Sequence, residues 1–136
     1  IASLAGLAVS SHGFRELGDP DLILPVPLHP KRLRRRGFNQ ALVLARFCFP
    51  DRGRIIDAST LVKISPTVPQ TQLSGTERRR NISGSFSVKQ SQKVKNKRIL
   101  LIDDVFTTGS TVNECARVLR RAGAARVEIF TLARTV

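Results

Sequence analysis

The chain has 136 residues, of which 41% are hydrophobic and 24% charged, a composition typical of one globular domain and not of a disordered segment. Lysines and arginines number 23 against 10 aspartates and glutamates, so the formal net charge is +13. A balance this basic favours polyanionic partners, either a nucleic acid backbone or small phosphorylated ligands. With seven Phe and no Trp or Tyr, the chain offers no evident base-stacking platform for single strands.

The N-terminal run IASLAGLAVS is apolar for about ten residues, which is too short to span a bilayer. It also lacks the basic flank of a secretory signal. Its apolar residues recur at helical spacing, so we expect a buried helix and no membrane insertion. Because Met is absent, even at position 1, we expect the chain to begin inside a longer protein.

The first third of the chain predicts a strand, a loop and a helix. Leu22–Pro27 is a short apolar run bounded by prolines, which cannot continue a ladder, so a strand should end there. The basic segment Leu28–Gly37 is expected to be a loop. A helix is predicted over Phe38–Phe49, ended by Pro50. The apolar face of that helix is expected to carry Phe38, Leu42, Ala45 and Phe49.

The middle of the chain gives weaker signals. Leu61–Ile64 is a candidate strand, and Ser85–Val88 is a candidate edge strand followed by a basic surface turn. Ser65–Thr76 is rich in Pro, Gln, Ser and Gly, which predicts a long exposed loop of the kind that carries function. The capping-box pattern Ser74–Glu77 predicts a short helix through Arg80.

The last third predicts a strand, a helix and a second strand. Arg98–Val105 is a nearly continuous apolar run, as expected for a central parallel strand covered on both faces. A capping box at Thr111–Glu114 predicts the start of a helix that stops at Gly123, and Val127–Leu132 is the next strand. The apolar face of the helix is expected to carry Val112, Cys115, Ala116 and Leu119. This βαβ unit predicts an α/β fold with a mostly parallel sheet.

The strongest chemical signal lies where the apolar strand meets this helix. Asp103 and Asp104 stand at the carboxyl end of the strand, where open parallel sheets bind ligands. The turn into the helix consists of Thr107, Thr108, Gly109, Ser110 and Thr111. A helix N-terminus with free N–H groups favours a phosphate, whereas the two carboxylates would repel it. We therefore expect the carboxylates to accept hydrogen bonds from an attached sugar, which describes a ribose 5-phosphate site.

The segment ILLIDDVFTTGST, residues 99–111, resembles the phosphoribosyl pyrophosphate (PRPP) signature of type I phosphoribosyltransferases. The segments LPVPLHPKRLRRRGFNQA and PQTQLSGTERRRNISGSF are similar to the ComF/GntX family of such domains, which is associated with competence and DNA uptake. The resemblance runs from about Leu22 to Leu132. It implies the Rossmann-like fold of these enzymes, a mostly parallel sheet flanked by helices, in a single phosphoribosyltransferase-like domain over residues 1–136.

The resemblance also assigns roles to residues. Asp103 and Asp104 would be the catalytic pair that holds the ribose hydroxyls, and Thr107–Thr111 would bind the 5-phosphate. Mg²⁺ would be carried by PRPP near the acid pair, with no direct protein ligands. A flexible loop at Ser65–Arg80 would close over the substrate. Its candidate contact residues are Gln70, Gln72, Arg78, Arg80 and Asn81.

Two departures from the family pattern are visible. Members commonly carry an N-terminal zinc-binding cysteine module, which we expect to lie in a missing N-terminal part. Val62, Lys63 and Ser65 stand where relatives are often richer in arginine, which leaves open how strongly the flexible loop holds a pyrophosphate. Cys48 and Cys115 lie in predicted helices with no CxxC pattern, so we expect core positions, a reducing cytoplasm and no zinc site.

The basic segment after the first strand has two interpretations. It would form the pyrophosphate loop, in which fixed cations neutralise the charge that grows on a diphosphate leaving group. Its candidate residues are Lys31, Arg32, Arg34, Arg35, Arg36 and Gly37. Alternatively it is a nucleic acid surface or a solvated patch, and both roles can hold together. Asn39 and Gln40 either orient a substrate or start the following helix.

Two functions therefore stay open. The first is a pyrophosphate-releasing phosphoribosyltransferase, a glycosyltransferase that acts on an unidentified acceptor base in a ComF-like role in DNA uptake. The second is a non-catalytic module that senses PRPP or a nucleotide while its basic surface binds DNA or a DNA-processing protein. A receiver domain is excluded because no Asp or Lys follows Asp104, and a Walker-type hydrolase is excluded because its motif is absent.

Overall fold

The computed structural model describes residues 19–65, 76, 83–106 and 109–134. The expected N-terminal helix lies outside these residues, as does the short helix through Arg80 apart from Thr76. In chain order the elements are β1 (Leu22–Pro25), α3 (Pro30–Arg36), α4 (Gln40–Cys48), the 3₁₀ helix η1 (Pro50–Ile55), β2 (Leu61–Lys63), β3 (Phe86–Val88), the 3₁₀ helix η3 (Ser91–Lys93), β4 (Arg98–Phe106), α6 (Ser110–Arg121) and β5 (Arg126–Arg134).

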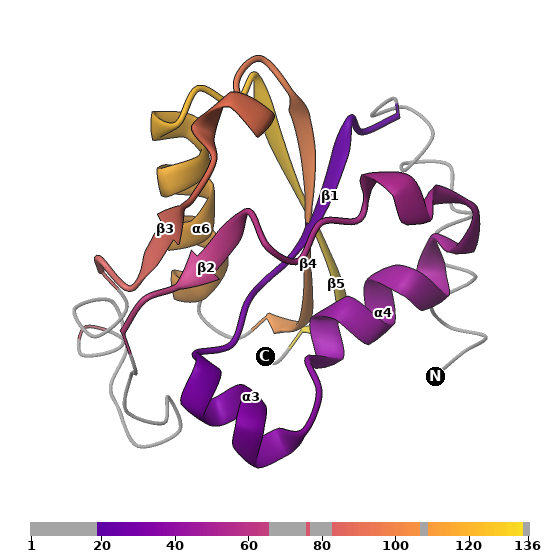
Figure 1. Ribbon diagram of the computed structural model, residues 1–136, viewed down its shortest axis with the longest axis vertical. Coiled ribbons are helices and arrows are strands. Elements are labelled where there is room, and N and C mark those ends of the chain that lie inside the picture. Colours follow the sequence, from indigo (N-terminus) through magenta and orange to yellow (C-terminus); the bar gives the residue numbers. More distant parts are fainter. Residues whose placement is uncertain (1–18, 66–75, 77–82, 107–108, 135–136) are drawn as a thin grey trace.

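Among the described residues, three parallel strands form the central sheet, in the order β1-β4-β5 (Figure 1). Leu101 in the middle strand is paired with Leu24 on one side and Ile129 on the other. On its other side, β1 forms a parallel bridge between Ile23 and Ile56. The short strands β2 and β3 form a separate antiparallel pair. The expected α/β fold with a mostly parallel sheet is confirmed.

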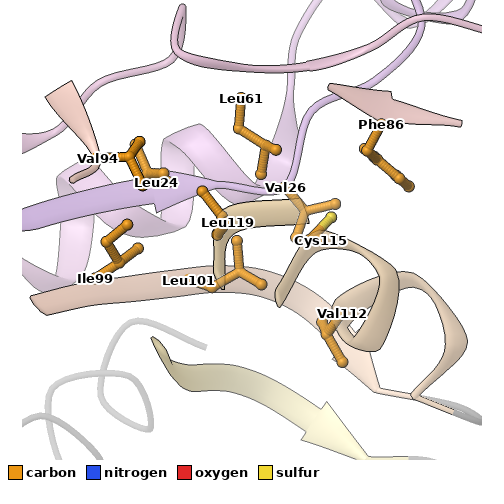
Figure 2. Packing of buried hydrophobic residues seen from close by; sticks show 10 residues of the cluster. All are labelled: Leu24, Val26, Leu61, Phe86, Val94, Ile99, Leu101, Val112, Cys115 and Leu119. Carbon is orange, nitrogen blue, oxygen red and sulfur yellow. The ribbon is translucent and has the colours of Figure 1, made fainter. Parts of the chain in front are cut away.

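Both faces of β4 are buried, which explains its uninterrupted apolar sequence. Because side chains alternate along a strand, Ile99 and Leu101 enter one core while Leu100 and Ile102 enter the other. The first core lies between the sheet, α6 and the β2-β3 pair (Figure 2), and consists of Leu24, Val26, Leu61, Phe86, Val94, Ile99, Leu101, Val112, Cys115 and Leu119. The second lies under α4 and consists of Ile23, Ala41, Leu44, Ala45, Cys48, Phe49, Leu100, Ile102 and Phe130.

The helix α6 buries the face that its sequence predicts, but it begins differently. It starts at Ser110, with Gly109 as N-cap at φ 80°, so the capping box expected at Thr111 is wrong. The reason is that Glu114 is engaged elsewhere. Its carboxylate accepts hydrogen bonds from the Gly84 amide at 3.2 Å and from Arg117 at 2.6 Å, and cannot reach back to the helix start.

The predicted face of α4 is partly wrong. Phe38 was expected on the apolar face, yet it precedes the helix and is 49% exposed. Asn39 is the N-cap, and its Oδ1 accepts a hydrogen bond from the Ala41 amide at 2.9 Å. The cap shifts the start of the helix to Gln40 and rotates the buried stripe. That stripe consists of Ala41, Leu44, Ala45 and Cys48.

The segment expected to be a pyrophosphate loop contains a helix, α3, and the prediction of a loop there is wrong. Pro30 occupies the first turn, where its missing N–H costs nothing, and Gly37 ends the helix at φ 85°. The His29 ring Nδ1 accepts a hydrogen bond from the Lys31 amide at 3.2 Å. Residues that start a helix and a residue that ends one therefore flank the basic run. The run itself buries no residue, so it has no apolar periodicity that would have indicated a helix.

Candidate functional site

The acid pair lies at the carboxyl end of the central strand. Asp103 is paired in register with Thr131 of β5. The side chains of Asp103 and Asp104 are both half-buried. The Asp104 amide donates a hydrogen bond to Asp103 Oδ1 at 2.9 Å, which fixes the first carboxyl against the backbone of the second. The residues chosen from the sequence are therefore presented at the edge of the sheet where parallel α/β folds bind ligands.

The Asp103 carboxyl has an unusual electrostatic environment. Burial raises its pKa to about 7, and hydrogen bonding to Asp104 and repulsion from its charge add to the increase. Near neutral pH the group can therefore be either a hydrogen-bond donor or an acceptor. A ligand that donates hydrogen bonds or carries positive charge would favour the ionised form. Strongly raised carboxyl pKa values of this kind are typical of functional sites.

The turn after β4 brings a helix N-terminus to the same place. Gly109 is buried at φ 80°, a conformation that side chains other than glycine rarely adopt. Ser110 is buried and Thr111 half-buried in the first turn of α6. The remaining predicted turn residues, Thr107 and Thr108, lie outside the described residues. A helix of this length offers backbone N–H groups and a positive dipole end to an anion.

The basic helix α3 lies at the carboxyl end of β4 (Figure 1), the end of the strand that carries the acid pair. The Val26 amide donates to the Ile102 carbonyl oxygen at 2.8 Å, so the chain leaves β1 beside the residue that precedes Asp103. Within the described ranges, no carboxylate lies within ion-pair distance of any cation of α3. These exposed cations are Lys31, Arg32, Arg34, Arg35 and Arg36.

Lys63 is a further cation of this region, which the sequence singled out only as a departure from arginine. It ends β2 and is half-buried, with its Nζ 5.5 Å from the centre of the Phe86 ring. Burial lowers the pKa of Lys63, and the nearby charge of Arg32 lowers it further. Cys115 is within electrostatic range of both Lys63 and Asp103. Lys63 therefore interacts electrostatically with α3 and with Cys115, which in turn interacts with Asp103 of the acid pair.

The amide side chains that follow α3 make contacts within the protein. Besides capping α4, Asn39 donates from Nδ2 to the Val26 carbonyl oxygen at 3.1 Å, which ties the end of β1 to the helix. The Gln40 Oε1 accepts a hydrogen bond from Arg36 at 3.0 Å. These contacts agree with the helix-starting interpretation. A substrate-orienting role for either residue stays a prediction.

Of the proposed flexible loop, the structure describes Ser65 and Thr76 and the residues that flank it. Gln70, Gln72, Arg78, Arg80 and Asn81 lie outside the described residues. On the near side, the Ile64 amide donates to the Ser85 carbonyl oxygen at 2.7 Å. On the far side, Gly84 is held by Glu114 of α6. Both ends of the segment are therefore attached beside the helix whose N-terminus lies at the candidate site.

Among the described residues, no group of three or more His, Cys, Asp or Glu side chains is arranged to hold a metal ion. Asp103 and Asp104 supply carboxylate oxygens, the ligand type that Mg²⁺ prefers, but an ion there would need further oxygens from a ligand or water. The described part of the chain also has no helix with the length and apolarity needed to cross a membrane.

Comparison with known proteins agrees with this geometry. Residues 55–135 match the family model of the phosphoribosyl transferase domain. DNA utilization protein YhgH of Salmonella typhi is 39% identical over a region that covers 86% of this chain and 51% of that protein. Competence protein F of Haemophilus influenzae is 36% identical, covering 98% of this chain and 59% of that protein. The chain therefore spans about half the length of the curated relatives it matches.

A solved structure supports the same fold. Glutamine phosphoribosylpyrophosphate amidotransferase from B. subtilis, complexed with ADP and GMP, aligns with a TM-score of 0.56. The alignment covers 96% of this chain and 25% of that one, at 20% sequence identity. The relatives confirm the resemblance to ComF proteins, and the solved structure confirms the type I phosphoribosyltransferase fold.

Proposed function

The chain belongs to the phosphoribosyl transferase domain family, and from this we propose that its acid pair and glycine turn bind PRPP together with Mg²⁺. One observation carries the proposal. The half-buried Asp103 lies at the carboxyl end of the central strand, and the positive-φ Gly109 opens α6 directly after it. Diol acceptors and a phosphate-binding helix N-terminus thus lie side by side, as ribose 5-phosphate requires.

Each part of the ligand has a partner in this arrangement. Asp103 and Asp104 accept hydrogen bonds from the two ribose hydroxyls, and the N–H groups of the first turn of α6 bind the 5-phosphate. Hydroxyls of Ser110 and Thr111 can donate to the same phosphate. Mg²⁺, carried by the diphosphate near the acid pair, would supply positive charge to the departing pyrophosphate. No covalent intermediate with the protein is required.

The cations of α3 complete the site in this proposal. When a base nitrogen attacks the anomeric carbon, the bond from that carbon to the pyrophosphate oxygen breaks and the diphosphate leaves with the electron pair. Arg34, Arg35 and Arg36 are exposed and have no ion-pair partner among the described residues, so they can neutralise that growing charge. Lys63, within electrostatic range of Arg32 of α3 and of Cys115, would add a further positive charge.

Calorimetric titration with PRPP and Mg²⁺ tests the binding proposal. The double variant Asp103→Asn, Asp104→Asn should stay folded and lose at least about tenfold in affinity, since each charge-assisted hydrogen bond is worth about 1.5–3 kcal/mol. The matched control is Asp19→Asn, Asp51→Asn, which removes two exposed carboxylates and should bind as the wild type does. Wild-type affinity in the first variant would refute the site.

Binding alone does not distinguish transfer from sensing. If the protein is an enzyme, adding the right base to the PRPP complex should release pyrophosphate, and the acid-pair variant should not. If it is a sensor, PRPP should bind without pyrophosphate release with every purine and pyrimidine base tested. The cations of α3, which have no ion-pair partner among the described residues, favour the sensor's second feature, a surface for DNA or a DNA-processing protein, as much as they favour a leaving group.

We further propose a ComF-like role in DNA uptake and natural transformation, in the cytoplasm. Support comes from relatives named DNA utilization protein and Competence protein F. The test is the transformation frequency of the source organism carrying the Asp103→Asn, Asp104→Asn allele on its chromosome. A frequency equal to that of the Asp19→Asn, Asp51→Asn strain would show that the acid pair has no part in this role.

A further inference from the structure

A second basic surface lies at the amino end of the sheet, opposite the acid pair. The strands β4 and β5 begin there, α6 ends there, and η3 lies beside them (Figure 1). We call this surface the amino-edge surface. Its cations are Lys93, Lys95, Lys97, Arg98, Arg120, Arg121 and Arg126. They include four cations of residues 93–98, part of the basic surface turn predicted after Ser85–Val88, and this turn has no part in the phosphoribosyl site.

Two loops belong to this surface: residues 94–97, between η3 and β4, and residues 122–125, between α6 and β5. Backbone hydrogen bonds hold these two loops together. The Asn96 amide donates to the Gly123 carbonyl oxygen at 2.8 Å, and the Ala125 amide donates to the Lys97 carbonyl oxygen at 2.9 Å. The stem of Lys95 is so close that a Cβ at Gly123 would lie 3.2 Å from its Cγ. These contacts fix the two loops relative to each other, so the cations in and beside them lie on one rigid part of the fold.

Carboxylates neutralise only part of this charge. Arg98 pairs with Asp21 at 3.5 Å, which also lies near Lys97. Lys93 is 3.8 Å from Asp57, and Arg126 pairs with Glu128. In the part of the chain that the structure describes, three carboxylates therefore lie near seven cations. The four exposed cations that have no ion-pair partner among the described residues are Lys95, Lys97, Arg120 and Arg121.

The fold itself accounts for only two of these four. Arg120 and Arg121 lie in the last turn of α6, where positive side chains interact favourably with the helix dipole. Lys95 and Lys97 follow η3, a 3₁₀ helix of only three residues, and Lys97 lies near Asp21, the carboxylate that pairs with Arg98. The positive charge that remains on this surface is self-repulsive in the free protein and would be neutralised by a bound polyanion.

The side chains of the surface indicate which polyanion fits. Peripheral membrane surfaces combine cations with apolar side chains that insert between lipids. The exposed large apolar side chains of the described residues are Leu33, Phe38, Val43, Phe47, Ile64 and Ile129, and none belongs to these two loops, η3 or the end of α6. The surface also has no aromatic residue on which a base could stack. A partner held by repeated phosphates fits better than a lipid bilayer.

We propose that the amino-edge surface binds the phosphate backbone of a nucleic acid, without regard to base sequence. This binding does not rest on the acid pair, because the two sites are at opposite ends of the sheet. A nucleic acid at the amino end and a phosphoribosyl ligand at the carboxyl end can therefore be held at the same time.

The salt dependence of DNA binding by the 136-residue chain tests the proposal. The edge variant carries Lys95→Gln, Lys97→Gln, Arg120→Gln and Arg121→Gln. Fluorescence anisotropy with a labelled duplex gives log K against log salt, whose slope is about −0.9 for each phosphate neutralised. The slope should become less negative by up to about 3.6 in the edge variant. With a single strand, at about −0.7 for each contact, the change should approach about 2.8.

A variant of equal charge provides the comparison. It carries Lys31→Gln, Arg34→Gln, Arg35→Gln and Arg36→Gln in α3. A larger loss of slope in the edge variant than in the α3 variant supports the proposal. Equal losses would mean that net charge alone attracts DNA, and a loss confined to the α3 variant would place the contact on the other surface. Either result overturns the proposal.

Two further measurements exclude trivial outcomes. The edge variant should keep the wild-type response to PRPP and Mg²⁺, or the wild-type unfolding curve if the wild type shows no response. If the four substitutions together prevent folding, the pair Lys97→Gln, Arg121→Gln should give about half of the change in slope. Vesicles of phosphatidylserine and phosphatidylcholine provide the last test. Binding to them that the edge substitutions abolish, with DNA binding intact, would refute a nucleic acid partner.

Discussion

Replacing Asp103 with asparagine should make the ligand-free protein more stable at alkaline pH. Burial and the neighbouring Asp104 raise the pKa of the Asp103 carboxyl from 3.8 to about 7, so the folded protein holds this proton more tightly than the unfolded chain. The stability that the protonated group contributes is complete below pH 3.8 and is lost as pH rises through about 7. The asparagine side chain cannot ionise, yet it keeps an oxygen that can accept the Asp104 amide hydrogen bond.

The size of the effect follows from the same values. The interval from 3.8 to about 7, at about 1.4 kcal/mol for each pH unit, sets an upper limit of roughly 4 kcal/mol. The carboxyl keeps some contact with water, so we expect a smaller loss for the wild type, about 1–2 kcal/mol between about pH 5.5 and about pH 8. The pKa of Asp57 is lowered to about 2, and those of Asp21 and Glu114 are also lowered, so their contributions are lost only in more acidic solution.

Urea unfolding followed by circular dichroism measures this directly. The unfolding free energy of the wild type and of the control Asp51→Asn should fall by the same amount as pH rises across this window. That of Asp103→Asn should stay level and exceed the wild type by about 1–2 kcal/mol at the alkaline end. If the unfolding free energy of Asp103→Asn falls in parallel with that of the wild type, the Asp103 carboxyl is not buried and repelled by Asp104 as described. Its environment would then not support a role in ligand binding.

Three other substitutions have defined outcomes. Gly109→Val should weaken PRPP binding more than Thr107→Ala does, because φ 80° strains a branched residue by about 1–2 kcal/mol and its side chain would occupy the phosphate position; equal binding would contradict the turn geometry. Replacing all of Arg34–Arg36 with Ala should weaken calorimetric binding of PRPP while sparing ribose 5-phosphate, and equal losses for both sugars would point to long-range charge instead. Asn39→Ala removes a helix cap and the bond to Val26, so urea unfolding should show a loss of about 1–2 kcal/mol, and a loss near zero would contradict the structural role.

The sequence predicted the parts of the fold whose signals are local and uninterrupted. β4 is apolar at every residue that faces a core, and the spacing of Val112, Cys115 and Leu119 allows only one buried face for α6. The position of the acid pair follows from these two elements, since nothing but a short turn separates them. The family resemblance then supplied the proposed ligand, PRPP, which neither periodicity nor charge could have identified.

The errors arose where a residue had two possible partners. Glu114 fits a capping box by its spacing, but it is bonded to Gly84, thirty residues away in the chain. Asn39 had two interpretations, of which the structure shows the helix cap, while its substrate-orienting role stays a prediction. Likewise, no local pattern could show that Lys63 lies over Phe86, because the pairing of β2 with β3 joins segments that are far apart in sequence. Such contacts depend on the tertiary fold.

The hydrogen bond between Ile64 and Ser85 has a consequence for how this domain can vary. It brings the two ends of residues 65–84 together at the end of the β2-β3 pair, so the entropy of closing that segment depends only weakly on its length. Doubling the segment would cost about 0.6 kcal/mol, less than the loss of one buried methylene. Related proteins could therefore lengthen or shorten this stretch to suit different ligands, while the sheet, both cores and the acid pair stay as they are.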